Sequence, residues 1–247
     1  MKIRPSQISE FERADAPHVA PRLARHAREA FPKHCGYLGE EGVEEAVQYA
    51  FKEGASHNLT LASSIQLFLD LMFLLGRGFD HDVQLPWAVQ ILSDSSIGDE
   101  MVRMRTLHAK AIEYLDKVSG PNNEFIDAAQ VRIGQESPGI SRPGAEFEND
   151  MIQRLWRVFP EKCTYLCEDI LKQVIQRGIA LARQYELKQA RAVVVLTGLT
   201  FMLGSHFDTD PQFASINQAL NESAGESGAR ADRLYQAAIE YLKQWCG

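Results

Sequence analysis

Hydrophobic residues recur three and four positions apart along most of this chain, a pattern typical of amphipathic α-helices. In the segment 19–31, Leu23 and Ala27 follow this spacing, and Pro32 marks where the helix should end. An acidic start at Glu40 favours the next helix, because the N-terminal end of a helix carries partial positive charge. For the first half of the chain we expect helices at about residues 19–31, 40–57, 62–75, at a segment with Pro86 near its start, and at about 99–117.

The pattern of the first half returns in the second half at a constant offset of about 128 residues. The motif Phe-Pro-x-x-Cys-x-Tyr-Leu begins at Phe31 and again at Phe159. The motif Phe-x-Leu-Gly-x-x-Phe-Asp-x-Asp begins at Phe73 and again at Phe201. We call residues related in this way matched positions; the offset falls by one in the last helix. The sequence predicts an all-α protein with two tandem copies of a roughly five-helix domain, an internal duplication that forms paired lobes.

Turn-forming residues separate the two copies. Segments 119–123 and 137–144 are rich in Gly, Pro, Ser and Asn, and a single helical stretch is expected between them at about 124–133. The predicted organisation is a first domain at 1–120, a linker at 121–144 and a second domain at 145–247.

The third segment of each copy can be assigned as a helix only when the two copies are compared. Taken alone, Val193–Leu196 would also suit a buried strand, because β-branched residues favour strands. The matched segment, Ala62–Leu75, is long, mostly unbranched and followed by Gly76, which indicates a helix that is apolar nearly all round. Such a helix belongs at the centre of its domain. Gly76 and its matched residue Gly204 suit a left-handed C-terminal cap.

Composition and charge narrow the classes of function. The 247 residues are 45% hydrophobic and 24% charged, as in ordinary globular proteins. The net charge of −7 disfavours nucleic acids and anionic membranes as partners. The longest apolar run, 192–203, is well short of the roughly 20 residues that a membrane helix needs. The N-terminal residues lack the apolar stretch of a secretory signal. We therefore expect a cytoplasmic protein with reduced cysteines.

The most suggestive acidic motif is Asp80-x-Asp82, with Asp208-x-Asp210 at the matched positions. Clustered carboxylates can hold a hard cation, but the segment lacks the spaced ligands, the central Gly and the closing Glu of an EF-hand loop. Helix capping and turn hydrogen bonds are the favoured roles.

A thiol pair, Cys163 and Cys167, has helical spacing, yet the first copy keeps only Cys35 and has Gly39 at the other matched position. A structural role is therefore favoured over zinc, and we expect neither a metal nor a cofactor.

No catalytic motif is present. We find no Gly-x-Ser-x-Gly and no Gly-rich loop that ends in Lys-Ser or Lys-Thr. There is no His-Glu-x-x-His pair, and no histidine is matched by another histidine. The sequence therefore favours a protein that is not an enzyme, although a catalytic triad can assemble from distant residues.

Residues that differ between the copies are better candidates for function than those that they share. Trp87, Trp156 and Trp245 are matched by Ser215, Arg28 and Val118 respectively, and tryptophan is enriched at the centres of protein interfaces. Packing between the lobes or within a core is the simpler alternative for these three side chains.

Asp70 stands in the most apolar helix and is matched by Gly198. A carboxylate there is either satisfied by a structural partner or is an acid with a shifted pKa at a site. The predicted partner-binding residues are Trp87, Trp156, Trp245 and Asp70.

Three segments of the first copy carry a resemblance to a known group of proteins. They are Phe-Pro-x-x-Cys-x-x-Leu-Gly-Glu-x-Gly-Val from Phe31, Phe-Leu-Asp-Leu-Met-Phe-Leu-Leu-Gly from Phe68, and Phe-Asp-x-Asp-x-x-x-Pro-Trp-Ala from Phe79. The chain thereby resembles small helical bacterial proteins encoded beside type VI secretion spike and effector genes. The second copy departs from this pattern at Cys167, Gly198 and Ser215, which weakens the expectation that both lobes play equivalent roles.

The resemblance implies a cytosolic accessory protein that binds a secreted effector or spike component, as an immunity protein, chaperone or loading adaptor, and it brings no catalytic residues. We therefore expect a non-catalytic, protein-binding factor. The alternative is a small-molecule enzyme or sensor with a pocket between the two lobes, using Asp70.

Overall fold

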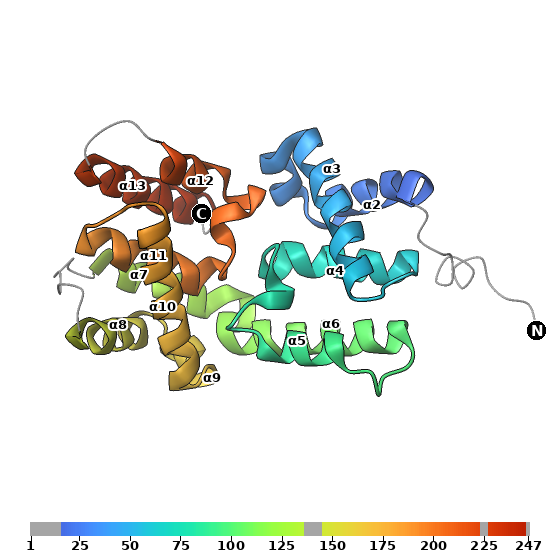
Figure 1. Cartoon of the computed structure of the whole chain (residues 1–247), viewed down its shortest axis with the longest axis horizontal. Coiled ribbons are helices and arrows are strands. Elements are labelled where there is room, and N and C mark those ends of the chain that lie inside the picture. The colour runs from blue at the N-terminus through green and yellow to red at the C-terminus, as the bar shows by residue number, and fades with distance from the viewer. Residues whose placement is uncertain (1–15, 136–144, 223–226, 246–247) are drawn as a thin grey trace, which may run out of the picture. The chain divides into compact units, whose positions relative to one another are not determined.

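The computed structural model describes residues 16–135, 145–222 and 227–245, and every secondary-structure element within these ranges is a helix. The all-α prediction is confirmed for these residues (Figure 1). They divide into two compact units: the first runs up to His81 and continues from Leu85 to Ala111, and the second contains Asp82–Gln84 and the residues from Ile112 onward. Within the described residues, no helix combines the length and apolar character that a bilayer-spanning segment requires.

The first unit contains the helices expected from the hydrophobic pattern of the first half. They are α2 (Ala16–Ala30), α3 (Pro32–Ser56), α4 (Ala62–Leu75), the 3-10 turn η2 (Phe79–His81), α5 (Pro86–Ser93) and the greater part of α6 (Glu100–Ser119). Pro86 occupies the first turn of α5, where its fixed φ suits the helix and its missing N–H is not needed.

The second unit begins with the end of α6 and contains the remaining helices. They are η3 (Pro121–Asn123), α7 (Glu124–Gln135), α8 (Ala145–Val158), α9 (Pro160–Tyr165), α10 (Glu168–Gln184), α11 (Ala190–Leu203), η4 (Phe207–Thr209), η5 (Pro211–Phe213), α12 (Ala214–Asn221) and α13 (Ser227–Trp245). The predicted linker 121–144 thus contains the helix that was expected inside it. Residues 136–144 of that linker lie outside the described residues.

Helices α4 and α11 contribute fully buried side chains to the cores of their units. Phe68 and Leu69 of α4 and Leu196 of α11 are fully buried. Val193–Leu196 lies inside α11, so the helical prediction made from its matched segment is confirmed. Gly76 (φ 97°) and Gly204 (φ 96°) end these helices with the positive φ that only glycine adopts without strain.

The segment that contains Cys-x-Tyr-Leu is helical, although it lies in the gap between the helices expected at 19–31 and 40–57. Pro32 and Pro160 start a helix at once, because a proline at the first helical position is already set to a helical φ. In the first unit α3 then continues past a kink at Gly39 (φ 68°, ψ −180°). In the second unit the helix breaks between Tyr165 and Glu168, which separates α9 from α10.

Matched positions share their backbone conformation even where their side chains differ. Phe31 (φ −127°, ψ 56°) and Phe159 (φ −128°, ψ 57°) precede their helices with the same angles. His57 (φ −94°, ψ 12°) and Tyr185 (φ −92°, ψ 10°) end the following helices alike. A difference in chemistry between matched positions is therefore a difference of side chain on a similar local backbone.

Helices α10 and α11 pack closely in the second unit, and one glycine permits this. A Cβ added to Gly178 would lie 2.3 Å from Oγ1 and 2.7 Å from Cα of Thr197. Both separations are far below van der Waals contact, and the second involves main chain that cannot rotate away. The approach of the two helices at this point depends on the missing side chain.

Candidate functional site

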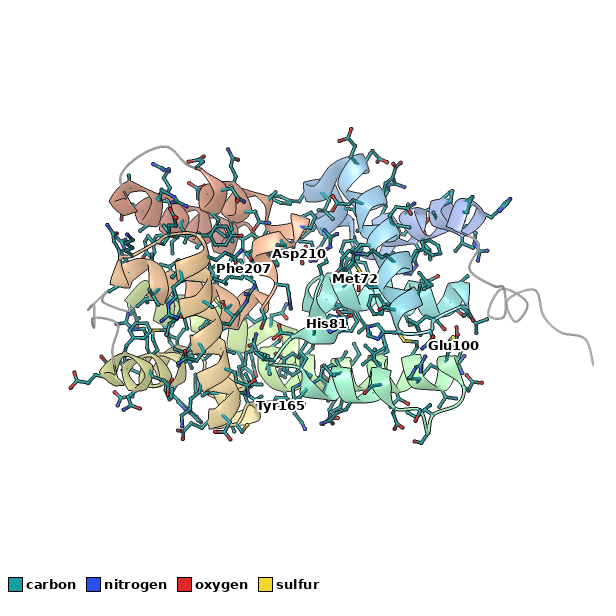
Figure 2. The ribbon with its side chains drawn as sticks, viewed as in Figure 1. Met72, His81, Glu100, Tyr165, Phe207 and Asp210 are labelled. Carbon is teal, nitrogen blue, oxygen red and sulfur yellow. The ribbon has the colours of Figure 1, made fainter. Side chains whose placement is uncertain are left out.

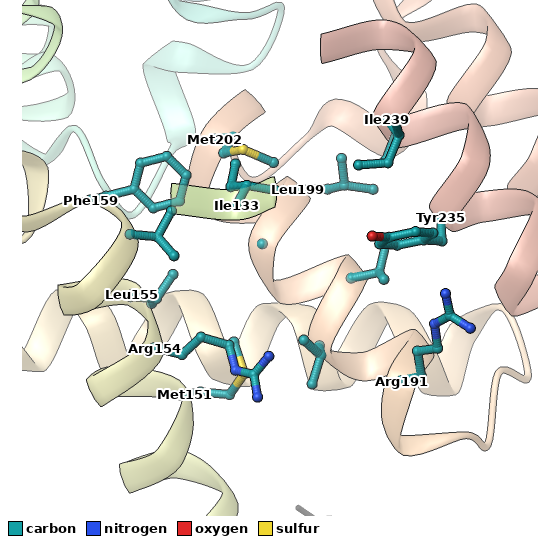
Figure 3. Close-up of a pocket in the computed structure, with 15 residues that line it drawn as sticks. Ile133, Met151, Arg154, Leu155, Phe159, Arg191, Leu199, Met202, Tyr235 and Ile239 are labelled. Atoms are coloured by element: carbon teal, nitrogen blue, oxygen red, sulfur yellow. The ribbon is translucent and has the colours of Figure 1, made fainter. Parts of the chain in front are cut away.

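An apolar cavity of about 150 Å³ lies within the second unit, between α8, α11, α13 and the end of α7. Figure 3 shows the side chains that converge on it. Those that supply its apolar wall include Ile133, Met151, Leu155, Leu199, Met202 and Ile239. The cavity thus has an almost wholly apolar lining drawn from four helices of one unit.

Gly198 of α11 explains why this space is open. It lines the cavity, and a Cβ built on it would meet nothing within 4 Å. Any larger residue at this position would extend into the free volume. The missing side chain of Gly198 therefore leaves part of the cavity free, at a helical position where glycine costs about 1 kcal/mol relative to alanine.

Two guanidinium groups and a phenol supply the polar part of the lining. Arg191 donates from Nη1 to Oδ1 of Asp232 at 2.7 Å, and its guanidinium carbon lies 4.6 Å from the centroid of the Tyr235 ring. Tyr235 lies between Arg191 and Ile239 in Figure 3. Arg154 enters the lining from α8. The cavity thus combines an apolar wall with two guanidinium groups, of which that of Arg191 is paired with Asp232.

In the first unit, the residue matched to Gly198 is Asp70, and its carboxylate is paired with His26. Oδ1 of Asp70 lies 2.8 Å from Nε2 of His26, which is itself matched to Arg154. The Asp70 side chain is 14% exposed, and burial raises the pKa of its carboxyl against the opposing effect of His26. Asp70 therefore has a structural partner, which is one of the two roles foreseen for it.

The three tryptophans lie in different environments. Trp87 of α5 is only 9% exposed, so its ring is part of the interior of the first unit. Trp156 of α8 is 43% exposed and is among the large apolar side chains open to solvent. The side chain of Trp245 lies outside the described residues. Trp156 alone among the described tryptophans offers a partner a large surface.

Asp80 does not play the capping or turn role that the sequence suggested. Its Oδ2 lies 2.7 Å from Nε2 of His57 and 3.4 Å from Nε2 of His81, while its Oδ1 is buried without a hydrogen-bond partner. The carboxylate points to side chains instead of main-chain N–H groups because His57, at the end of α3, lies against η2. His57 and His81, the latter labelled in Figure 2, do not form a motif of paired histidines along one helix, so the sequence holds no signal for their approach.

The other three acidic residues of the motif have different partners. Asp82 and Asp210 accept turn hydrogen bonds from the main-chain N–H groups of Gln84 and Gln212, as predicted, each at 2.9 Å. Asp82 does not cap α5; it accepts instead from the N–H and Oγ of Ser205 at 2.8 and 2.7 Å.

Asp208, the residue matched to Asp80, is held by a permanent cation. Oδ1 of Asp208 accepts from Arg177 at 3.2 Å, and Oδ2 accepts from the Tyr185 hydroxyl at 3.2 Å. Tyr185 is matched to His57, and Thr209 is matched to His81. The two imidazoles that lie beside Asp80 in the first unit are thus replaced by other side chains at the positions matched to them.

His57, Asp80 and His81 are the group best suited to a metal ion within the described residues. One ligand atom from each lies within 4.8 Å of the others. Neither Cys163, which is buried, nor Cys167, which is exposed, joins such a group in this part of the chain. The structural interpretation of these thiols therefore remains the simpler one.

Lys162 of α9 is a partly buried lysine that no sequence motif singles out. Its ammonium donates to the main-chain carbonyl of Phe201 and lies 4.6 Å from the centroid of the Phe201 ring. Burial lowers the pKa of Lys162 to about 8, against the opposing charge of Asp82. It serves the last turn of α11, where carbonyl groups lack helical partners.

Comparison of the chain with models of protein families, with curated proteins and with solved structures finds no match.

Proposed function

We propose that this chain is a non-catalytic, protein-binding accessory factor, and that the cavity of the second unit receives an apolar side chain of its partner. The observation that carries the proposal is the cavity itself, about 150 Å³ with an almost wholly apolar lining. Side chains that fill such pockets provide most of the binding energy of a protein interface.

The size of the cavity favours a side chain over a drug-sized molecule. Sites for such ligands measure roughly 300 to 1,000 Å³, whereas a cavity of about 150 Å³ accommodates one benzene-sized group. A leucine, methionine or phenylalanine from a partner is a group of that size.

We further propose that the two units arose by duplication of one helical domain and that they then diverged in function. Gly198 opens the cavity in the second unit, while Asp70 and His26 occupy the matched positions in the first. Trp156, exposed on the cavity-lining helix α8, is a further candidate for contact with the partner. Trp87, Trp245 and Asp70 stay in the predicted set, although the burial of Trp87 leaves a partner little of its ring to contact.

The resemblance noted in the sequence suggests the kind of partner. A cytoplasmic protein encoded beside type VI secretion genes would bind a secreted effector or spike component, as an immunity protein or as a chaperone or adaptor. Growth of cells that express the toxic effector together with this chain separates the two roles: an immunity protein restores growth, and an adaptor leaves the cells poisoned.

The test is quantitative affinity capture with the full chain as bait in extracts of the cells that produce it. The variant Gly198→Leu fills the cavity, and we expect it to lower recovery of the partner at least tenfold. The control is Gly36→Leu, since Gly36 is exposed in α3 and also has open space around its Cα. Equal recovery by wild type and Gly198→Leu would exclude the cavity as the binding site.

The alternative is a small-molecule enzyme or sensor, and the specific observation in its favour is again the apolar cavity, because apolar cavities of this volume in other proteins bind benzene. The cavity lies inside the second unit, so this alternative no longer needs a pocket between lobes. It predicts that indole or benzene raises the melting temperature saturably, that Gly198→Leu abolishes the rise, and that capture recovers no protein.

A further inference from the structure

A histidine-rich cluster in the first unit is separate from the apolar cavity and has no part in the function proposed above. His57 ends α3, and Asp80 and His81 belong to η2. Nε2 of His57 lies 2.7 Å and Nε2 of His81 lies 3.4 Å from the same carboxylate oxygen, Oδ2 of Asp80. Two imidazole nitrogens and a carboxylate oxygen thus meet at one point.

The Asp80 carboxylate is buried more completely than its hydrogen bonds explain. Its side chain is 0% exposed, and Oδ1 has no hydrogen-bond partner. A buried carboxylate needs both charge compensation and hydrogen bonds. At the matched position, Asp208 has both, because Arg177 and Tyr185 engage one oxygen each.

We propose that His57, Asp80 and His81 bind a first-row divalent transition-metal ion, with Zn²⁺ as the ion best suited to them. Two neutral imidazoles and one carboxylate form a common set of protein ligands for Zn²⁺. Mg²⁺ and Ca²⁺ are disfavoured, because both prefer oxygen ligands. The ion would compensate the charge of Asp80.

The separations in the cluster suit such an ion after small side-chain rotations. Zinc lies roughly 2.0 to 2.2 Å from nitrogen and oxygen ligands, so two of its ligand atoms are at most about 4.4 Å apart. The three ligand atoms here are all within 4.8 Å of one another. The metal would replace the proton that His57 and Asp80 share in the hydrogen bond between them.

The exposure of the cluster permits entry and leaves room for further ligands. The His81 side chain is 59% exposed, whereas those of His57 and Asp80 are 15% and 0% exposed. An ion can therefore reach the buried carboxylate from the side of His81. Three protein ligands leave a fourth tetrahedral position for water or another small ligand.

In the second unit, the positions matched to the two histidines of this cluster hold other side chains. Tyr185 and Thr209 stand where the first unit has His57 and His81, and Arg177 already compensates the charge of Asp208. The proposal therefore predicts one ion per chain.

The experiment uses the full chain after treatment with a chelator, titrated calorimetrically with Zn²⁺ and followed by visible absorption with Co²⁺. We expect one ion per chain and the Co²⁺ bands typical of nitrogen and oxygen ligands. His81→Gln should weaken binding at least tenfold, and because His81 is largely exposed this variant should still fold. His57→Gln should have the same effect, with circular dichroism to check its fold.

The control variant is His18→Gln, which removes an exposed histidine of the same unit outside the cluster. It should bind Zn²⁺ as the wild type does. Failure of the wild type to bind Zn²⁺ or Co²⁺ would overturn the proposal, and so would undiminished binding by His81→Gln, because ions would then be held elsewhere.

Discussion

Single side chains on similar local backbone give the two units different chemistry. His34 and Lys162 are matched, and each lies beside a phenylalanine of its central helix, Phe73 or Phe201. Burial lowers the pKa of both groups, yet only Lys162 carries an ammonium group to a helix carbonyl. Differences between single matched side chains therefore give the two units different ionisable groups.

Lys162 should make stability depend on alkaline pH. Burial lowers its pKa from 10.5 to about 8, so between these values the unfolded chain binds a proton that the folded chain has lost. The free energy of unfolding should therefore rise with pH across this window, by about 3 kcal/mol. Urea unfolding at several pH values measures it, and the rise should be absent in Lys162→Met. An equal rise in both proteins would assign it to another group.

The thiols should differ sharply in reactivity. Burial raises the pKa of Cys163 to about 12, while Cys167, four residues on, is exposed. Since the thiolate is the reactive form, iodoacetamide at pH 8 should modify Cys167 and leave Cys163 intact until the chain is unfolded. Mass spectrometry of a Cys246→Ser variant would follow both sites. Rapid native modification of Cys163 would contradict its burial.

At the scale of helices, two glycines of the second unit have opposite roles. Gly178 allows α10 to approach Thr197 of α11, whereas Gly198 faces the open cavity. Replacing each glycine by alanine should therefore have opposite effects on the free energy of unfolding.

Gly178→Ala should destabilise the chain by about 1–3 kcal/mol, because the methyl group would overlap the main chain of α11. Gly198→Ala should stabilise it by about 0.5–1 kcal/mol, because alanine favours a helix and meets nothing within 4 Å. Denaturant unfolding of both variants tests the pair. A loss of stability in Gly198→Ala would show that the cavity is not open at this position.

The helices could be predicted from sequence because their signals are local. Apolar spacing, the prolines at helix starts and the glycines at helix ends lie within a few residues of what they determine, as at Pro86 and Gly76. The gap expected between the helices at 19–31 and 40–57 is wrong, because one local signal can belong to two helices. Pro32 was interpreted as the end of one helix, whereas it also begins the next.

The candidate site could be predicted only in part, because its contacts join distant segments. The sequence shows that Asp70 is matched by Gly198. It does not show that Gly198 lines a cavity. The pairing of His57 with Asp80 spans 23 residues and has no motif in the sequence. Such contacts follow from how helices pack, which periodicity does not describe.

At the scale of the whole molecule, the chain order and the compact units do not coincide. Asp82–Gln84 belong to the second unit, although the residues on either side belong to the first. Asp82 binds Ser205, Gln84 donates to the carbonyl of Thr200 at 2.9 Å, and Val83 packs on the core of the second unit. A short internal segment thus completes a unit formed mainly by later residues.

Asp82→Ala should destabilise the chain by about 2–4 kcal/mol, since it leaves the buried N–H and hydroxyl of Ser205 without their acceptor. The control variant is Asp94→Ala. Asp94 accepts from the N–H and hydroxyl of Ser96 in the same manner, but it is exposed and should cost less than about 1 kcal/mol. Thermal unfolding compares the two variants, and equal losses would contradict the special role of Asp82.

The position of Asp82–Gln84 also bears on how the protein is made. A ribosome releases this segment more than a hundred residues before Thr200 and Ser205 emerge. During that interval the nascent chain carries Asp82 without the N–H and hydroxyl of Ser205, so the second unit reaches its final hydrogen bonding only late in synthesis. A product truncated before Thr200 would keep the segment without its partners and would present it to quality-control proteases.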